Sequence, residues 1–120
     1  MTLFSAGYQD SSALKRIFGF PGVIVDVRFN PYTKSLRWHQ SRFQELFGER
    51  YYHCRELGNR GYRSGTIDVV NLEAGMKAVV SLLEVADVLL LCCCASLQAC
   101  HRKVIIDEIE RKYGIKTLDL

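Results

Sequence analysis

Hydrophobic and polar residues follow two patterns along the chain. Short apolar runs rich in β-branched residues end at turn residues and predict strands. Longer segments place apolar residues three or four positions apart and predict amphipathic helices. The predicted strands are residues 2–6, 23–27, 51–54, 87–92 and 115–118, and the predicted helices are residues 11–18, 39–47, 68–85 and 96–113.

The alternation of strands with helices predicts a mostly parallel sheet with right-handed crossovers. We therefore expect a three-layer α/β fold in which about four or five strands are flanked by helices. Residues 1–120 fit one domain. In such sheets, ligands bind beyond the carboxyl ends of the strands, where the strand order reverses. Side chains at those ends are therefore the first candidates for a functional site.

The predicted strand 23–27 ends in two residues of opposite charge, Asp26 and Arg28. Side chains alternate along a strand, so both face the same way. The carboxylate can brace the guanidinium, and Arg28 can then offer its remaining donors to an oxyanion. Alternatively, the two residues form an ion pair that only anchors the following loop.

The predicted strand 87–92 is followed by a loop that is rich in cysteine and by the predicted helix 96–113, with Ser96 as its cap. Loop amides and a helix N-terminus form a natural anion site, and a thiol there has a lowered pKa. Cys92 lies at the strand end, and Cys100 is expected in the first helical turn. The expected catalytic residues are Cys92, Cys100 and Asp26, and the expected anion-binding residues are Arg28, His101 and Arg102.

Simpler roles exist for the same residues. Cys92, Cys93 and Cys94 can serve as small core residues. Cys93 should point opposite to Cys92, so we expect it to be buried and inert. His101 can be a histidine whose hydrogen bonds are satisfied at the start of the helix.

Metal binding is a further alternative, because the chain contains several sulfur and imidazole ligands. The spacing C-x-C-x5-C-H lacks the paired C-x2-C motifs of structural zinc sites. The chain also has no G-x-x-x-x-G-K and no G-x-G-x-x-G motif, and we expect no cofactor. A C-x5-R phosphatase motif that ends at Arg102 would need a cysteine at position 96, which is Ser96. The residues that could bind a metal are His53, Cys54, Cys92, Cys94, Cys100 and His101.

Positive charge is concentrated in one part of the chain. Residues 28–63 contain eight Arg or Lys and three Glu, whereas the formal net charge of the whole chain is +3. The same stretch is rich in aromatic residues, a combination that suits nucleic-acid or nucleotide binding. A solvated rim with a few core aromatics is the simpler explanation.

The cellular compartment is predicted from cysteine usage and from the apolar runs. The five cysteines are odd in number and three are adjacent, which argues against a disulfide framework. No run approaches the ~20 apolar residues that span a bilayer, and the N-terminus lacks a signal-peptide pattern. We expect a cytoplasmic protein that does not associate with membranes.

Several of these residues also occur in an order that resembles a bacterial and archaeal family called domain of unknown function 488. The resemblance begins at Phe4-Ser5-Ala6-Gly7-Tyr8 and continues through Asp26-Val27-Arg28, Pro31, Tyr52-His53, Glu56-Leu57-Gly58, Leu91-Cys92 and Cys100-His101-Arg102. It implies a compact α/β fold and adds Gly7, Tyr8 and Glu56 to the expected substrate-binding residues. Cys94 stands where that family has a glutamate, and Leu97 where it has a proline. A weaker likeness in architecture is to rhodanese-type sulfurtransferases.

Three functions follow from the sequence. The favoured one is an enzyme-like domain that binds a small anionic or phosphate-bearing ligand. The alternatives are a nucleic-acid or nucleotide binding module that uses residues 28–63, and a metal-binding protein that uses the cysteines and a histidine.

Overall fold

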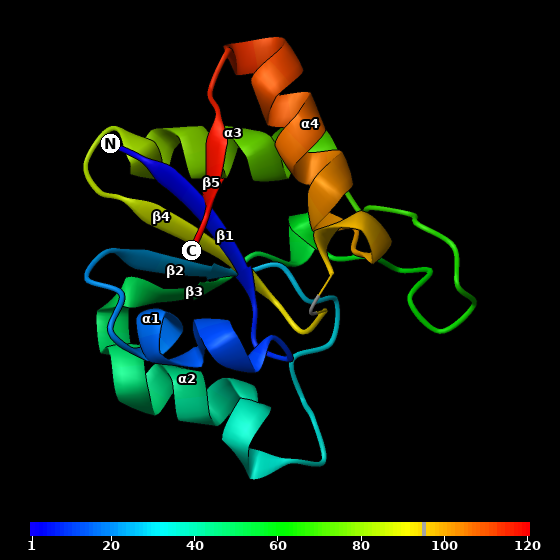
Figure 1. Cartoon of the computed structure of the whole chain (residues 1–120). Helices are drawn as coiled ribbons and strands as arrows, with labels where there is room; N and C mark the ends of the chain where they lie inside the picture. The colour runs from blue at the N-terminus through cyan, green and yellow to red at the C-terminus, as the bar shows by residue number, and fades with distance from the viewer. Residues whose placement is uncertain (95) are drawn as a thin grey trace.

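The apolar runs of the sequence form one sheet. The computed structural model describes residues 1–94 and 96–120, and in this part of the chain five parallel strands lie in the order β3-β2-β4-β1-β5 (Figure 1). The strands are β1 (Leu3–Gly7), β2 (Val23–Asp26), β3 (Tyr51–His53), β4 (Val88–Cys92) and β5 (Thr117–Asp119). The helices are α1 (Leu14–Phe18), α2 (Gln40–Phe47), α3 (Leu72–Leu83) and α4 (Arg102–Tyr113). The expected α/β fold is confirmed.

Helices cover both faces of the sheet, so its central strands are buried on both sides. In β4, Val88, Leu90 and Cys92 belong to the core beneath α3 and α4, while Leu89 and Leu91 belong to the core beneath α1 and α2. This alternation follows from the pleat of the strand. It explains why β4 is apolar throughout.

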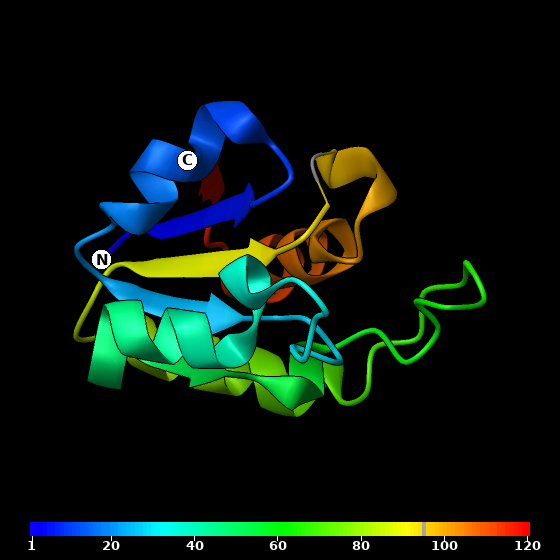
Figure 2. The same ribbon diagram turned by 90° about the horizontal axis from the view of Figure 1, so that it is seen from below.

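The order in which the strands are added to the sheet changes direction between the neighbouring strands β1 and β4. After β1, the chain passes through α1 on one face toward β2, and after β4 it passes through α4 on the opposite face toward β5 (Figures 1 and 2). The two crossovers therefore leave neighbouring strand ends in opposite directions. This is a topological switch point, where a crevice opens at the carboxyl edge of a parallel sheet.

Helices α1, α3 and α4 begin later than predicted, and α1 follows a 3-10 turn, Ser11–Ala13. Residues 68–71 precede α3, which starts at Leu72 because the side chain of Asn71 accepts a hydrogen bond from the Ala74 amide. Helix α4 starts at Arg102, after a short 3-10 turn, Leu97–Ala99. The prediction that Ser96 caps α4 and that Cys100 lies in its first turn was wrong.

The C-terminus of α4 lies at Tyr113, as predicted. Gly114 follows it in a left-handed conformation, with φ of 68°. No helix in the described part of the chain has the length and apolar character needed to cross a membrane.

Candidate functional site

A pocket of about 340 Å³ lies at the carboxyl ends of β1, β2 and β4, where the strand order reverses. Residues beyond each of these strand ends line it, together with the start of α4 and an exposed loop, residues 59–67, that projects beyond the sheet (Figure 2). Its volume falls in the range of small-molecule sites. The lining residues nearest the strands are Tyr8, Arg28, Phe29, Cys92, Cys93, Cys94 and His101.

Asp26 and Arg28 form one wall of the site, and their side chains meet as the strand alternation predicted. The Arg28 Nε donates to Asp26 Oδ1 at 2.9 Å, and Nη2 donates to Oδ2 at 2.6 Å. Tyr51 adds a hydroxyl donor to Oδ2 at 2.5 Å. Asp26 is fully buried, so these bonds replace the water that the carboxylate loses on folding.

The remaining donors of Arg28 are also directed at protein atoms. Nη1 donates to the Trp38 carbonyl at 2.5 Å and lies 3.4 Å from the Tyr8 hydroxyl. Asp26 therefore orients Arg28 as expected, and most of the guanidinium is used to fix the pocket wall. Trp38 and Tyr51 were not predicted as partners, because no local pattern links them to Asp26 or Arg28.

These contacts and the burial of the wall shift the pKa values of its ionisable side chains. Burial raises the pKa of Tyr51, and the negative charge of Asp26 raises it further. Burial also raises the pKa of Tyr8 to about 12, although Arg28 opposes the shift. Burial acts to lower the pKa of Arg28, but the hydrogen bonds and charge of Asp26 outweigh it, so that pKa rises.

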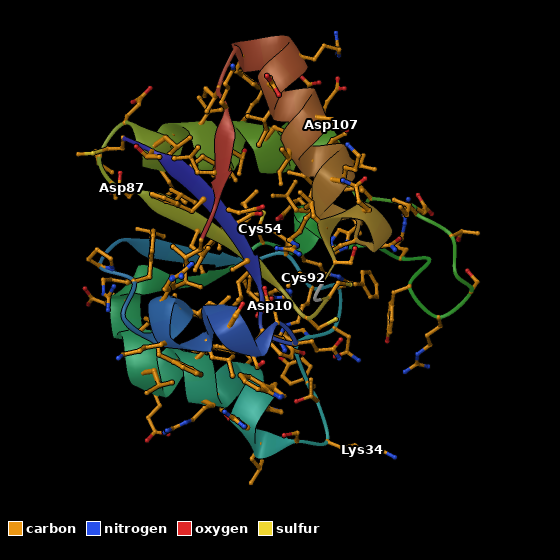
Figure 3. The ribbon with its side chains drawn as sticks, viewed as in Figure 1. Asp10, Lys34, Cys54, Asp87, Cys92 and Asp107 are labelled. Carbon is orange, nitrogen blue, oxygen red and sulfur yellow. The ribbon has the colours of Figure 1, made fainter. Side chains whose placement is uncertain are left out.

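Three sulfur atoms meet beneath the pocket. The Sγ atoms of Cys92, Cys94 and Cys100 all lie within 4.8 Å of one another, and we call this group the three-cysteine cluster. Cys92 ends β4 (Figure 3) and Cys94 follows in the loop, whereas Cys100 comes from the segment before α4. Cys100 has an extended backbone, with φ of −110° and ψ of 143°. It is buried in the core beneath α3 and α4, on the same face of the sheet as Cys92.

Two basic side chains surround this cluster. Arg102, which is 2% exposed, donates from Nε to Cys100 Sγ at 3.3 Å and from Nη2 to the Cys94 carbonyl at 3.0 Å. His101 donates from Nε2 to the Val27 carbonyl at 2.8 Å, because a carbonyl can only accept. The other ring nitrogen, Nδ1, lies 3.9 Å from Cys100 Sγ.

The thiols differ in acidity according to their neighbours. A hydrogen bond from Cys92 lowers the pKa of Cys100 against the effect of burial, with His101 and Arg102 adding to the shift. The same donor, Cys92, lowers the pKa of Cys93, which is half-buried, to about 6. Burial acts to lower the pKa of His101, but the bond and charge at Cys100 outweigh it and raise that pKa.

Gly7 lets the cysteine loop approach β1. A Cβ atom at Gly7 would lie 1.6 Å from the Cys94 carbonyl oxygen and 3.2 Å from Arg102 Nη2. Only glycine allows this contact, so Gly7 positions the cysteine loop against β1.

The structure places the expected site residues other than Gly7 in three groups. Tyr8, Arg28, Cys92 and His101 line the pocket. Glu56 lies apart, and its Oε2 accepts from the Cys54 thiol at 3.5 Å. The remaining expected residues are buried beneath the pocket and do not line it: Asp26, Cys100 and Arg102.

Cys93 differs from its expected position. The strand alternation predicted a buried and inert side chain, but Cys93 is half-buried and lines the pocket. The chain bends out of β4 immediately after Cys92, so the alternation ends there. The loop residues 59–67 were also missed as part of the site, because nothing in their sequence indicates what they cover.

Several basic residues of the stretch 28–63 have partners within the protein. Asp26 neutralises Arg28, and Arg50 donates to the carbonyls of Phe20 and Gly22, in the turn that leads into the amino end of β2. Exposed acidic partners pair with Arg42 and Arg60.

Comparison of the chain with known proteins finds no matching family model, no matching curated protein and no matching solved structure. Membership of domain of unknown function 488 stays a prediction from the motifs.

Proposed function

We propose that this protein is an enzyme-like domain that binds a small molecule in the pocket at the carboxyl ends of β1, β2 and β4 and acts on it through cysteine sulfur. The observation that carries the proposal is the position of Cys92, Cys93 and Cys94, which line the pocket at the switch point of the sheet. Parallel sheets bind their ligands at this position.

The pocket walls favour a ligand of modest polarity. Aromatic and aliphatic groups from Tyr8, Phe29 and Ile67 supply much of its lining. The charge of Arg28 is balanced by Asp26, and the donors of Arg102 point to Cys100 and Cys94. A substrate with one acceptor group near Arg28 fits these walls better than the strongly charged anion expected from the sequence.

Protection of Cys93 from alkylation tests this proposal. The metal-free protein is screened with a library of small polar fragments, and the rate at which N-ethylmaleimide modifies Cys93 is followed by peptide mass spectrometry. We expect bound fragments to slow the modification of Cys93 at least ten-fold, because they occupy the pocket that it lines.

Two variants control for access to the pocket. Ile67→Trp adds bulk at the pocket lining and should abolish the protection, whereas Val85→Trp introduces the same side chain at an exposed residue outside the pocket and should not. The proposal fails if no fragment slows the modification, or if protection is unchanged in Ile67→Trp.

A further inference from the structure

We propose that the three-cysteine cluster binds one thiophilic divalent cation, such as Zn²⁺, at the floor of the pocket. The inference rests on the proposed function, because it names the reactive centre of that site. The ligands are the sulfur atoms of Cys92, Cys94 and Cys100, which two separate segments of the chain bring together.

The distances between the sulfur atoms suit such an ion. Ligands in a tetrahedral zinc site lie about 2.3 Å from the metal, so neighbouring sulfur atoms are separated by about 3.8 Å. The cluster has all its Sγ–Sγ separations within 4.8 Å. Movements of at most about 1 Å by the side chains would therefore bring the three sulfurs to bonding distance.

The buried charge of Arg102 also requires a negative partner. In the described part of the chain, no carboxylate forms a salt bridge with Arg102, although it is 2% exposed. An unpaired charge is expensive to bury. Three thiolates and one divalent cation carry a single net negative charge, which Arg102 balances.

A single thiolate at Cys100 would also balance Arg102, so charge alone does not determine how many sulfurs bind. The geometry adds the other two, since Cys92 and Cys94 lie beside Cys100. Thiolate ligands select zinc and related soft ions over magnesium or calcium.

The surroundings of the cluster resemble the outer shell of a metal site. Arg102 donates an N–H to Cys100 Sγ, and ligand atoms in metal sites commonly accept such bonds. Cys92 and Cys94 line the pocket, so an ion held by them would lie beside the space that a small molecule occupies. Three protein ligands with one open position are characteristic of catalytic zinc.

His101 is the other group close to this position. Its Nε2–H is held by the Val27 carbonyl, and its Nδ1 lies 3.9 Å from Cys100 Sγ. Because the group of ligand atoms that all lie within 4.8 Å of one another contains the three sulfurs and not His101, we assign His101 to the surroundings rather than to the ligand set.

Cobalt binding tests the assignment. The full chain, purified without a metal-affinity tag and kept reduced, is titrated with Co²⁺ and then with Zn²⁺ as competitor. We expect one Co²⁺ per chain, visible light absorption typical of tetrahedral cobalt, and sulfur-to-cobalt charge-transfer bands that Zn²⁺ removes.

Serine variants count the ligands. Each of Cys92→Ser, Cys94→Ser and Cys100→Ser should weaken Co²⁺ binding at least 100-fold. Cys93→Ser, which lies between two ligands in the sequence but outside the cluster, should bind as the wild type does. Circular dichroism in the presence of EDTA checks that each variant folds. His101→Ala should keep Co²⁺ affinity within about ten-fold.

Several results would overturn the inference. These are the absence of Co²⁺ and Zn²⁺ binding by the folded wild type, binding that survives Cys100→Ser, or a 100-fold loss in His101→Ala. Fragment protection of Cys93 is measured without metal. If fragments protect Cys93 but the protein does not bind cobalt, only the metal site is rejected and the proposed function stands. Cobalt binding without any fragment protection would instead contradict the proposed function.

Discussion

At the scale of single residues, the pocket wall formed by Asp26 and Arg28 depends on polar side chains that are buried and hydrogen-bonded to one another. Asp26 has no exposed surface, and it accepts hydrogen bonds from Arg28 and Tyr51. Removing one member of such a set leaves another charge or dipole without a partner, which costs more than the bond itself contributes. Asp26 and Tyr51 therefore support the pocket wall, although neither lines the pocket.

Tyr51 should make stability depend on pH in alkaline solution. Burial and the charge of Asp26 raise its pKa, so the folded chain keeps the phenol proton at pH values where the unfolded chain releases it. This contribution is complete below the ordinary tyrosine pKa of about 10 and decreases as the pH rises, by about 1.4 kcal/mol per pH unit.

Tyr51→Phe should reduce the slope of unfolding free energy against pH between about pH 10 and 11, measured by urea denaturation, by up to that amount. Tyr32→Phe, at an exposed side chain, is the matched control and should keep the wild-type slope. An unchanged slope in Tyr51→Phe would show that this phenol ionises equally in both states.

The sequence predicted the pairing of Asp26 with Arg28, because two positions on the same strand face must lie together. It did not predict Tyr51 or Trp38, which reach the pair from β3 and from the turn before α2. Contacts of this kind depend on strand order and helix placement, which hydrophobic periodicity does not encode.

At the scale of elements, the end of β1 and the loop after β4 pack together at Gly7. The absence of a side chain there lets the Cys94 carbonyl approach and accept a hydrogen bond from Arg102. The position of the three-cysteine cluster therefore depends on a residue that contributes no chemistry of its own.

Gly7→Ala should lower the unfolding free energy by about 2 kcal/mol or more, because the new methyl group would overlap the Cys94 carbonyl oxygen. It should also displace the cysteine loop and weaken Co²⁺ binding. Gly19→Ala is the control, since a Cβ there meets only the Lys15 carbonyl at 3.2 Å, and should change stability by less than about 1 kcal/mol. Urea denaturation compares the two. Equal stability of Gly7→Ala and wild type would contradict the close packing.

Hydrophobic periodicity predicted nine elements of the fold but not where α4 begins. The segment before α4 contains apolar residues at helical spacing, yet it forms a 3-10 turn and then an extended residue, Cys100. That extended backbone directs Cys100 into the core beside Cys92 instead of along a helix N-terminus. The sequence therefore identified the right cysteine for a different physical reason.

At the scale of the whole molecule, the pocket results from the order of the strands. Because β1 and β4 are neighbours whose crossovers run on opposite faces, their carboxyl ends leave space at the edge of the sheet. The alternation of strands and helices predicted such an edge, but it could not identify which two strands meet there. Nor could it predict that the loop 59–67 lines the pocket.

Arsenic binding tests the central claim most directly, since the claim is that sulfurs from β4 and from the segment before α4 meet at one point. Trivalent inorganic arsenic binds three thiols that lie close together, and native mass spectrometry counts the atoms held by each chain. The account predicts one arsenic per chain in the wild type and in Cys93→Ser, and none held by three sulfurs in Cys92→Ser, Cys94→Ser or Cys100→Ser. An adduct of unchanged stability in Cys100→Ser would contradict the account, because the loop after β4 would then hold the arsenic alone.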